Sequence, residues 1–155
     1  ICVETMSATD EAVQAVKAAR ENTECEVIST YTFEKTQQGE YRTMMGIGPA
    51  DAARASLEAG ADIIGTNCGN GMAGMVAIVR EMRSHYPDVP ILVHANAGLP
   101  KLVDGEQVFP ETPEEMAQQV PELVRAGANV VGGCCGTTPA HIRAIREAVE
   151  RLTMA

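Results

Sequence analysis

"EAGADIIGTNC", residues 58–68, recurs later in the chain as "RAGANVVGGCC", residues 125–135. Each copy has a β-branched, apolar run between small residues and a cysteine, which is typical of a buried strand that follows a helix. A common helix-to-strand junction would explain the repeated glycines, but it would not explain a cysteine at the end of both copies. The alignment pairs two glycines and this cysteine: Gly60 with Gly127, Gly65 with Gly132, and Cys68 with Cys135.

Short apolar strands alternate with Ala-rich helices on both sides of this repeat. We expect loops after the second and fourth strands, where the chain is polar or rich in Pro and Gly. Ser7 or Thr9 is the candidate N-cap of the first helix, and Thr138 that of the last. The last helix also carries an apolar stripe of Ile142, Ile145, Val149 and Leu152. The predicted strands are 1–5, 25–33, 61–68, 89–97 and 128–135, and the predicted helices are 7–21, 49–60, 72–86, 112–127 and 138–152.

Strict alternation of apolar strands and helices predicts an α/β fold with a parallel sheet. Five units in 155 residues correspond to about 31 residues per unit, the spacing of a (β/α)8 TIM barrel of ~250 residues. The chain could be a complete doubly wound sheet or five of the eight units of a barrel. Because it begins abruptly at "ICVET", without an initiator Met, we expect a barrel fragment. The repeat then places Cys68 and Cys135 on alternate strands, which supply one interior layer of a barrel.

Composition excludes several classes of function. The formal net charge of −9 argues against a nucleic-acid-binding surface, which needs a basic stripe, and against adsorption to anionic membranes. No apolar run approaches the ~20 residues of a membrane-spanning helix, and no signal peptide opens the chain. The five cysteines are an odd number in a chain unlike a disulfide scaffold, so we expect a reducing, cytoplasmic environment.

Three of the cysteines, Cys68, Cys134 and Cys135, lie at the ends of predicted strands. Three thiolates supply three ligands for a tetrahedral Zn²⁺ and leave the fourth position open, which is the arrangement of a catalytic zinc site. Glycines on both sides of the Cys134–Cys135 pair allow the chain to leave regular strand geometry, so that adjacent sulfurs can turn the same way. Spacing alone leaves two alternatives open, namely buried inert thiols and a redox-active pair.

Several motifs resemble the homocysteine S-methyltransferase family. They are "GTNCGNG" at 65–71, "HANAGLP" at 94–100 and "GGCCGTTPAHI" at 132–142. The segment 27–49, "VISTYTFEKTQQGEYRTMMGIGP", is similar to the form found in cobalamin-dependent methionine synthases. The resemblance covers essentially the whole chain but only the C-terminal part of the family's domain. It implies that residues 1–155 supply strands four to eight of a homocysteine-binding barrel, with the N-terminal units missing.

The resemblance also implies a reaction, the transfer of a methyl group to the thiol of homocysteine to give methionine. It implies zinc held by Cys68, Cys134 and Cys135, which activates the substrate thiolate. Methylcobalamin, with methyltetrahydrofolate, is the favoured donor, bound on a separate cobalamin- or folate-binding domain or protein. Betaine, S-methylmethionine or S-adenosylmethionine is the alternative donor, and a non-catalytic zinc-binding half-barrel is the alternative function. We expect the fragment alone to be inactive.

Two further residues enter the predicted site through the resemblance. Glu4, at the end of the first strand, is implied to bind the substrate amino group. Asn96, where the fourth strand meets its loop, is implied to lie near the zinc and the substrate. His94 is more simply a hydrogen-bonded core histidine than a metal ligand. Asn67 should point away from the site if its strand is regular, and it could hold a loop or support a ligand.

Overall fold

Five parallel strands form the central sheet of the computed structural model, which describes residues 1–154. Each strand lies within or beside its predicted range, and most are shorter than predicted. The strands are β1 (Cys2–Met6), β2 (Ile28–Tyr31), β5 (Ile63–Asn67), β6 (Ile91–Ala95) and β9 (Val130–Gly133).

The order of the strands distinguishes the two predicted folds. In the sheet they run β1-β2-β5-β6-β9, which is also their order along the chain. A doubly wound sheet reverses its strand order at a switch point, and this sheet has no reversal in residues 1–154. Because βα crossovers are right-handed, a sequential order places every helix on the same face of the sheet. The fold is therefore five βα units of a (β/α)8 barrel, as predicted.

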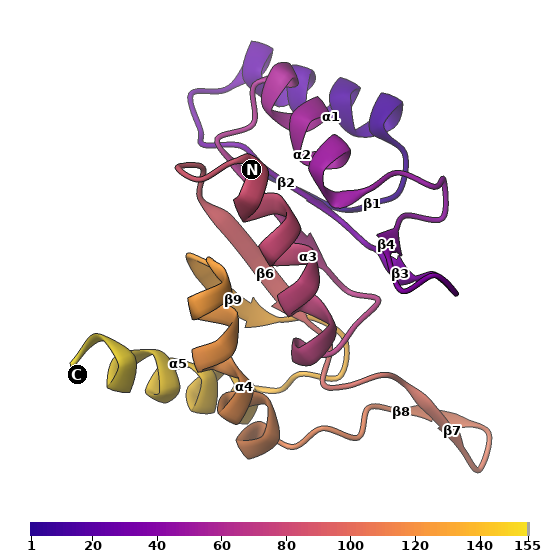
Figure 1. Ribbon diagram of the computed structural model, residues 1–155, viewed down its shortest axis with the longest axis vertical. Coiled ribbons are helices and arrows are strands. Elements are labelled where there is room, and N and C mark those ends of the chain that lie inside the picture. Colours follow the sequence, from indigo (N-terminus) through magenta and orange to yellow (C-terminus); the bar gives the residue numbers. More distant parts are fainter. Residues whose placement is uncertain (155) are drawn as a thin grey trace.

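Five helices cover one face of the sheet. Figure 1 shows α1 and α2 at one end of the molecule, α4 and α5 at the other, and α3 crossing in front of β6. The core between helices and sheet contains Ile64, Ile91 and Val93 from the strands, packed against buried Met75 and Met82 of α3. The helices are α1 (Thr9–Asn22), α2 (Pro49–Ala59), α3 (Met72–His85), α4 (Pro113–Ala126) and α5 (Pro139–Thr153).

The opposite face of the sheet corresponds to the barrel interior. Side chains alternate along a strand, so Val3 packs on the helix side of β1 while Cys2 and Glu4 face the interior. At the other edge of the sheet, Val130 of β9 is 41% exposed. In a closed barrel the interior is filled by layers of side chains that together come from all eight strands. Five strands leave it open, which explains why apolar side chains at both edges remain exposed.

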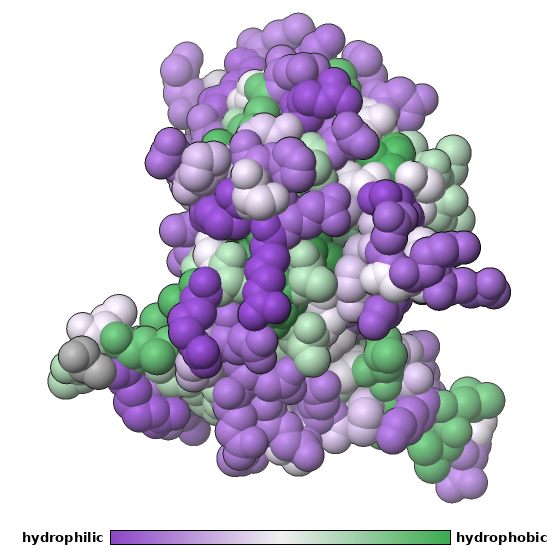
Figure 2. Space-filling view, viewed as in Figure 1, coloured by the Kyte–Doolittle hydropathy of each residue, from purple (hydrophilic) through white to green (hydrophobic). Residues whose placement is uncertain are grey.

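Two β-hairpins occupy the segments that we expected to be loops. They are β3–β4 (Glu34–Lys35 and Tyr41–Arg42) and β7–β8 (Lys101–Val103 and Glu106–Val108). In the second, Asp104 and Gly105 both have left-handed backbones, with φ of 51° and 85°, as a two-residue type I′ turn requires. Leu102 and Val103 of this hairpin are exposed, and Figure 2 shows apolar surface at the lower right, where Figure 1 places β7 and β8.

The predicted helix starts were partly wrong. The N-cap of α1 is Ala8, not Ser7 or Thr9, and it makes no side-chain capping bond. The cap of α5 is Thr138 as predicted, and it pairs with His141 in a capping box. In the predicted apolar stripe of α5, Ile145 is buried but Ile142 is 44% exposed, because no helix covers that edge within residues 1–154. None of the helices in this range has the length and apolar content to span a bilayer.

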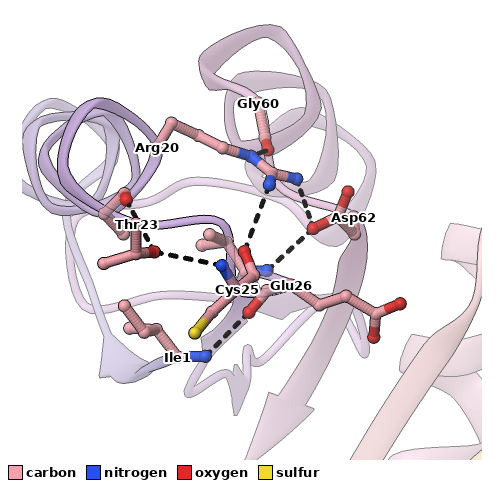
Figure 3. A network of polar contacts seen from close by, with 9 residues as sticks. Ile1, Arg20, Thr23, Cys25, Glu26, Gly60 and Asp62 are labelled. Atoms are coloured by element: carbon pink, nitrogen blue, oxygen red, sulfur yellow. Dashed lines mark hydrogen bonds and ion pairs between the residues drawn. The ribbon is translucent and has the colours of Figure 1, made fainter.

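An arginine from an earlier helix contacts the start of each copy of the internal repeat. Arg20 of α1 donates to the Gly60 carbonyl and forms an ion pair with Asp62, whose carboxylate accepts from the Val27 backbone at 2.7 Å (Figure 3). The second copy has the same arrangement. Arg83 of α3 donates to the Gly127 carbonyl and to Asn129 Oδ1, both at 2.7 Å, and Asn129 Oδ1 accepts from the Ile91 backbone at 3.0 Å. Each copy therefore fixes the start of two neighbouring strands.

Replacing Arg83 with methionine should lower the free energy of unfolding by roughly 2–3 kcal/mol, because its charged guanidinium also serves three loop carbonyls that would lose their donor. Arg80→Met on the same helix is the matched control. Arg80 makes an exposed ion pair with Glu122 at 3.2 Å, and its loss should cost less than about 1 kcal/mol. Urea unfolding of the two variants measures the difference, and equal losses would contradict a structural role for the repeated arginine.

Candidate metal site

Three cysteine sulfurs converge at the carboxyl ends of β5 and β9. Cys68 Sγ lies 3.7 Å from Cys135 Sγ, and Cys134 Sγ lies 3.9 Å from Cys135 Sγ. All three sulfurs lie within 4.8 Å of one another, and no other His, Cys, Asp or Glu in residues 1–154 joins the group. Since β6 lies between β5 and β9, the two cysteines matched by the repeat do end alternate strands. We refer to Cys68, Cys134 and Cys135 as the sulfur cluster.

Backbone conformation at the strand ends aims these sulfurs at one point. Cys68 has a φ of 59°, a left-handed conformation uncommon for a residue other than glycine, and its N–H donates to the His94 carbonyl at 3.0 Å. After the cysteine pair, Gly136 is also left-handed, with a φ of 78°. The chain therefore turns sharply at Cys68, after β5, and again at Gly136, after the Cys134–Cys135 pair. These turns end the regular strand geometry in which successive side chains point to opposite faces and the sulfurs would be kept apart.

Two of the flanking glycines act differently from our prediction. Gly132 and Gly133 do not have left-handed backbones. Instead, a Cβ at Gly132 would lie 2.7 Å from the His94 ring, and a Cβ at Gly133 would lie 2.5 Å from the Thr137 side chain. These glycines make room for neighbouring side chains, and Gly136 alone of the three supplies conformational freedom.

The spacing of the sulfurs fits a tetrahedral thiolate site. With Zn–S bonds of about 2.3 Å, neighbouring sulfurs of a tetrahedron lie about 3.8 Å apart. The separations of 3.7 and 3.9 Å in the sulfur cluster match that value. A disulfide would require about 2.05 Å, and all five cysteines are free thiols. Three sulfurs in this arrangement can hold one metal ion and leave one coordination position for a substrate.

Desolvation and the neighbouring thiols oppose ionisation of Cys135 when no cation is present. Burial, followed by the hydrogen bond with Cys68 and the proximity of Cys134, raises the pKa of the Cys135 thiol to about 11. Cys135 therefore stays protonated at neutral pH unless a cation offsets the charge of the thiolates. A metal ion that binds here must release this proton, so its affinity rises with pH.

The loop after β6 holds the cysteine pair in place. Asn96, which is 3% exposed, accepts at Oδ1 from the Cys135 backbone N–H at 3.1 Å. The Cys134 N–H donates to the Ala95 carbonyl at 2.7 Å, and the Ala97 N–H donates to the Cys135 carbonyl at 2.9 Å. The structure thus places Asn96 beside the sulfur cluster, as predicted, with its amide oxygen on the backbone of Cys135.

The other predicted residues lie farther from the sulfurs. Glu4 is exposed on the interior face of β1, which is separated from β5 by β2. His94 is half-buried on the same face, its ring lies against Gly132, and burial lowers its pKa. His94 is not a member of the sulfur cluster, and its ring makes no hydrogen bond within residues 1–154, unlike the hydrogen-bonded core histidine that we expected.

Asn67 faces the sulfur cluster, because the strand is not regular at Cys68, and this placement fits the supporting role that the sequence left open. It is fully buried, and its side-chain Nδ2 lies 3.9 Å from Cys134 Sγ. The same side chain contacts Thr5 and Thr30. The left-handed turn at Cys68 brings both Asn67 and Cys68 toward the site, and the amino-acid pattern of the strand carries no signal for that turn. Sequence analysis did not identify Thr5 as part of this network.

Comparisons with known proteins identify the family to which the chain belongs. The sequence pattern described as homocysteine S-methyltransferase matches residues 1–149. The methionine synthase of Mycobacterium leprae (strain TN) is 40% identical over 111 residues, and that of Mycobacterium tuberculosis (strain ATCC 25618 / H37Rv) is 39% identical over 112. These matches cover 70% and 71% of this chain but only 9% of either relative.

Among solved structures, the apo form of the homocysteine methyltransferase MmuM from Escherichia coli has a similar fold, with a TM-score of 0.72 at 19% identity. The match covers 95% of this chain and 48% of MmuM, so the chain spans about half of that protein. The structural match supports the barrel architecture, and the match over residues 1–149 identifies the family. The chain therefore belongs to the homocysteine S-methyltransferase family.

Proposed function

We propose that this chain is the part of a homocysteine S-methyltransferase that binds zinc and the thiol substrate. Residues 1–155 would supply strands four to eight of its barrel. The observation that carries the proposal is the convergence of three cysteine sulfurs within 4.8 Å of one another at the carboxyl ends of two strands. Barrel enzymes build their active sites at that end of the strands.

Each residue of the site would have a distinct task. Cys68, Cys134 and Cys135 would hold zinc as thiolates, and their negative charge would keep a bound substrate sulfur electron-rich. Zinc, when bound, would supply the Lewis acidity that keeps a thiol with an ordinary pKa near 8.5 deprotonated at neutral pH. Asn96 would fix the position of Cys135 through its backbone N–H. Glu4 would bind the ammonium group of homocysteine from the open face of β1.

Methylcobalamin is the methyl donor that we propose, carried on a domain or protein that binds cobalamin or folate. Similarity over 70% of this chain to proteins named methionine synthase supports it, together with the resemblance of residues 27–49 to the cobalamin-dependent form. Cys135 is exposed and Cys68 and Cys134 are half-buried, so a separate donor domain could reach the sulfur cluster. Betaine, S-methylmethionine and S-adenosylmethionine are the donors that a methyl-transfer assay should compare with it.

Zinc K-edge X-ray absorption of the intact protein tests the proposal. The protein should contain one zinc with three sulfur ligands, and addition of homocysteine should add a fourth sulfur. Methionine is the matched control, because a thioether carries no proton to lose and should leave the sulfur count unchanged. Zinc with an unchanged ligand set in homocysteine would instead indicate a non-catalytic metal-binding half-barrel. A Cys134–Cys135 disulfide in the purified protein would contradict the zinc assignment.

A further inference from the structure

Asn67 connects three strands to the sulfur cluster. Its side chain is fully buried and its amide uses all four of its hydrogen-bonding positions. Oδ1 accepts from the Thr5 backbone N–H at 2.8 Å and from the Thr30 hydroxyl at 2.6 Å. Nδ2 donates to the Thr5 hydroxyl at 2.7 Å and to Cys134 Sγ at 3.9 Å. No other buried amide in residues 1–154 contacts a sulfur of the cluster.

The orientation of this amide follows from its partners. A backbone N–H can only donate, so the atom that faces the Thr5 N–H must be the amide oxygen. The amide nitrogen must then face Cys134, with one N–H directed at the sulfur. A flipped amide would place two donors against each other at Thr5. The N–H directed at Cys134 is therefore fixed by contacts on β1 and β2, not by the cysteine itself.

Thr5 is a strained residue. Its φ is 60°, and a β-branched residue with a left-handed backbone is an outlier. The pairing of β1 with β2 shifts register at the same place, between Val3 and Met6. Asn67 bonds both the backbone N–H and the hydroxyl of Thr5, which holds this conformation. Thr5 directly follows Glu4, so the turn also sets the direction of the strand end that carries the carboxylate.

We propose that Asn67 is a positioning residue that couples the Cys134 sulfur to the left-handed turn at Thr5, and so to the strand end that bears Glu4. The inference rests on the proposed function, in which Cys134 is a metal ligand and Glu4 contacts substrate. An N–H donated to a metal-bound thiolate withdraws charge from the sulfur and fixes its direction. One side chain would thereby set the electron density of a ligand and the position of the substrate-binding strand.

Cobalt(II) is the probe for this inference, because its thiolate-to-metal charge-transfer band reports the electron density of the ligating sulfurs. The measurement is the difference spectrum between cobalt-loaded and metal-free intact protein. Asn67→Asp keeps the two acceptor contacts but removes both N–H donors and adds a negative charge. The sulfur of Cys134 should become more electron-rich, so we expect the band to move to longer wavelength.

Thr5 variants test the coupling without touching a cysteine. Thr5→Ala removes the hydroxyl that accepts one hydrogen of Nδ2, so the charge-transfer band should move in the same direction as in Asn67→Asp. The affinity of the Thr5→Ala protein for cobalt should fall about 10-fold. Thr5→Ser keeps the hydroxyl and should restore both properties. Thr30→Val is the matched control, because it removes a bond to Oδ1 but leaves both N–H contacts and the Thr5 backbone bond in place. Its band should stay at the wild-type position.

The outcomes separate this inference from the proposed function. A wild-type protein without any thiolate-to-cobalt band would overturn the proposed metal site. A normal wild-type band that Asn67→Asp leaves unmoved would overturn the role of Asn67 alone. Equal shifts in Thr5→Ala and Thr30→Val would show that loosened packing, and not the N–H contact, moves the band, and that result would also overturn the inference.

Discussion

Under the proposed function, replacing Cys135 with alanine in the intact protein should abolish both metal binding and methyl transfer to homocysteine. Cys135 is the member of the sulfur cluster with short separations to both others, 3.7 Å to Cys68 and 3.9 Å to Cys134. Its loss leaves two sulfurs that do not define a tetrahedral site. Loss of a residue that only supports a ligand costs 10–100-fold in metal affinity, so we expect loss of a ligand to cost more than about 100-fold. Methyl transfer should fall below about 1% of wild type, since the substrate thiol would stay protonated at neutral pH.

Cys25→Ala is the matched control for this variant. Cys25 is an exposed free thiol near the start of β2, and Figure 3 shows it beside Ile1 and Arg20, in the network of the first arginine. Its contacts there are made by backbone atoms, which alanine retains. Zinc content by mass spectrometry and methyl transfer should both equal wild type. If Cys135→Ala kept one zinc per chain, the metal would have to be held elsewhere, and the sulfur cluster would be a group of inert thiols.

The strand pattern and the repeat were sufficient to predict the fold. Apolar runs at regular spacing identified five βα units, and the distance between the two copies correctly placed Cys68 and Cys135 on alternate strands. The repeat and the family resemblance favoured a barrel over a doubly wound sheet, and the sequential strand order of the structure confirms that choice. The β7–β8 hairpin could have been predicted from Asp104-Gly105, a typical type I′ turn sequence.

The sequence indicated which residues belong to the candidate site, but not the hydrogen bonds that connect them. Composition at strand ends identified three cysteines, and the family resemblance added Asn96, which lies beside them. The contact from Asn67 to Cys134 joins residues far apart in the chain and depends on left-handed backbones at Cys68 and Thr5. Threonine and cysteine rarely adopt that conformation, so regular strand geometry does not predict the direction of Asn67.

Replacing Gly65 with alanine should destabilise the protein severely, by about 3 kcal/mol or more, although the change adds a single methyl group. A Cβ at Gly65 would lie 2.0 Å from the Leu92 carbonyl oxygen and 2.9 Å from its carbon. These are backbone atoms of β6, the strand that pairs with β5 at this position. They cannot move away without breaking the hydrogen bonds between two central strands of the sheet, and overpacking of this kind is not relieved by a rotamer change.

Gly132→Ala is the matched control, because the internal repeat aligns Gly132 with Gly65. A Cβ at Gly132 would approach Cδ2 of the His94 ring at 2.7 Å, and that ring is a half-buried side chain that can turn away. We expect a loss of about 1 kcal/mol or less, measured by urea unfolding of both variants. Equal losses would mean that the two glycines are required for the same backbone reason. A large loss for Gly65→Ala alone would show that the backbone of β6 requires glycine at residue 65, whereas the His94 side chain can make room for a methyl group at residue 132.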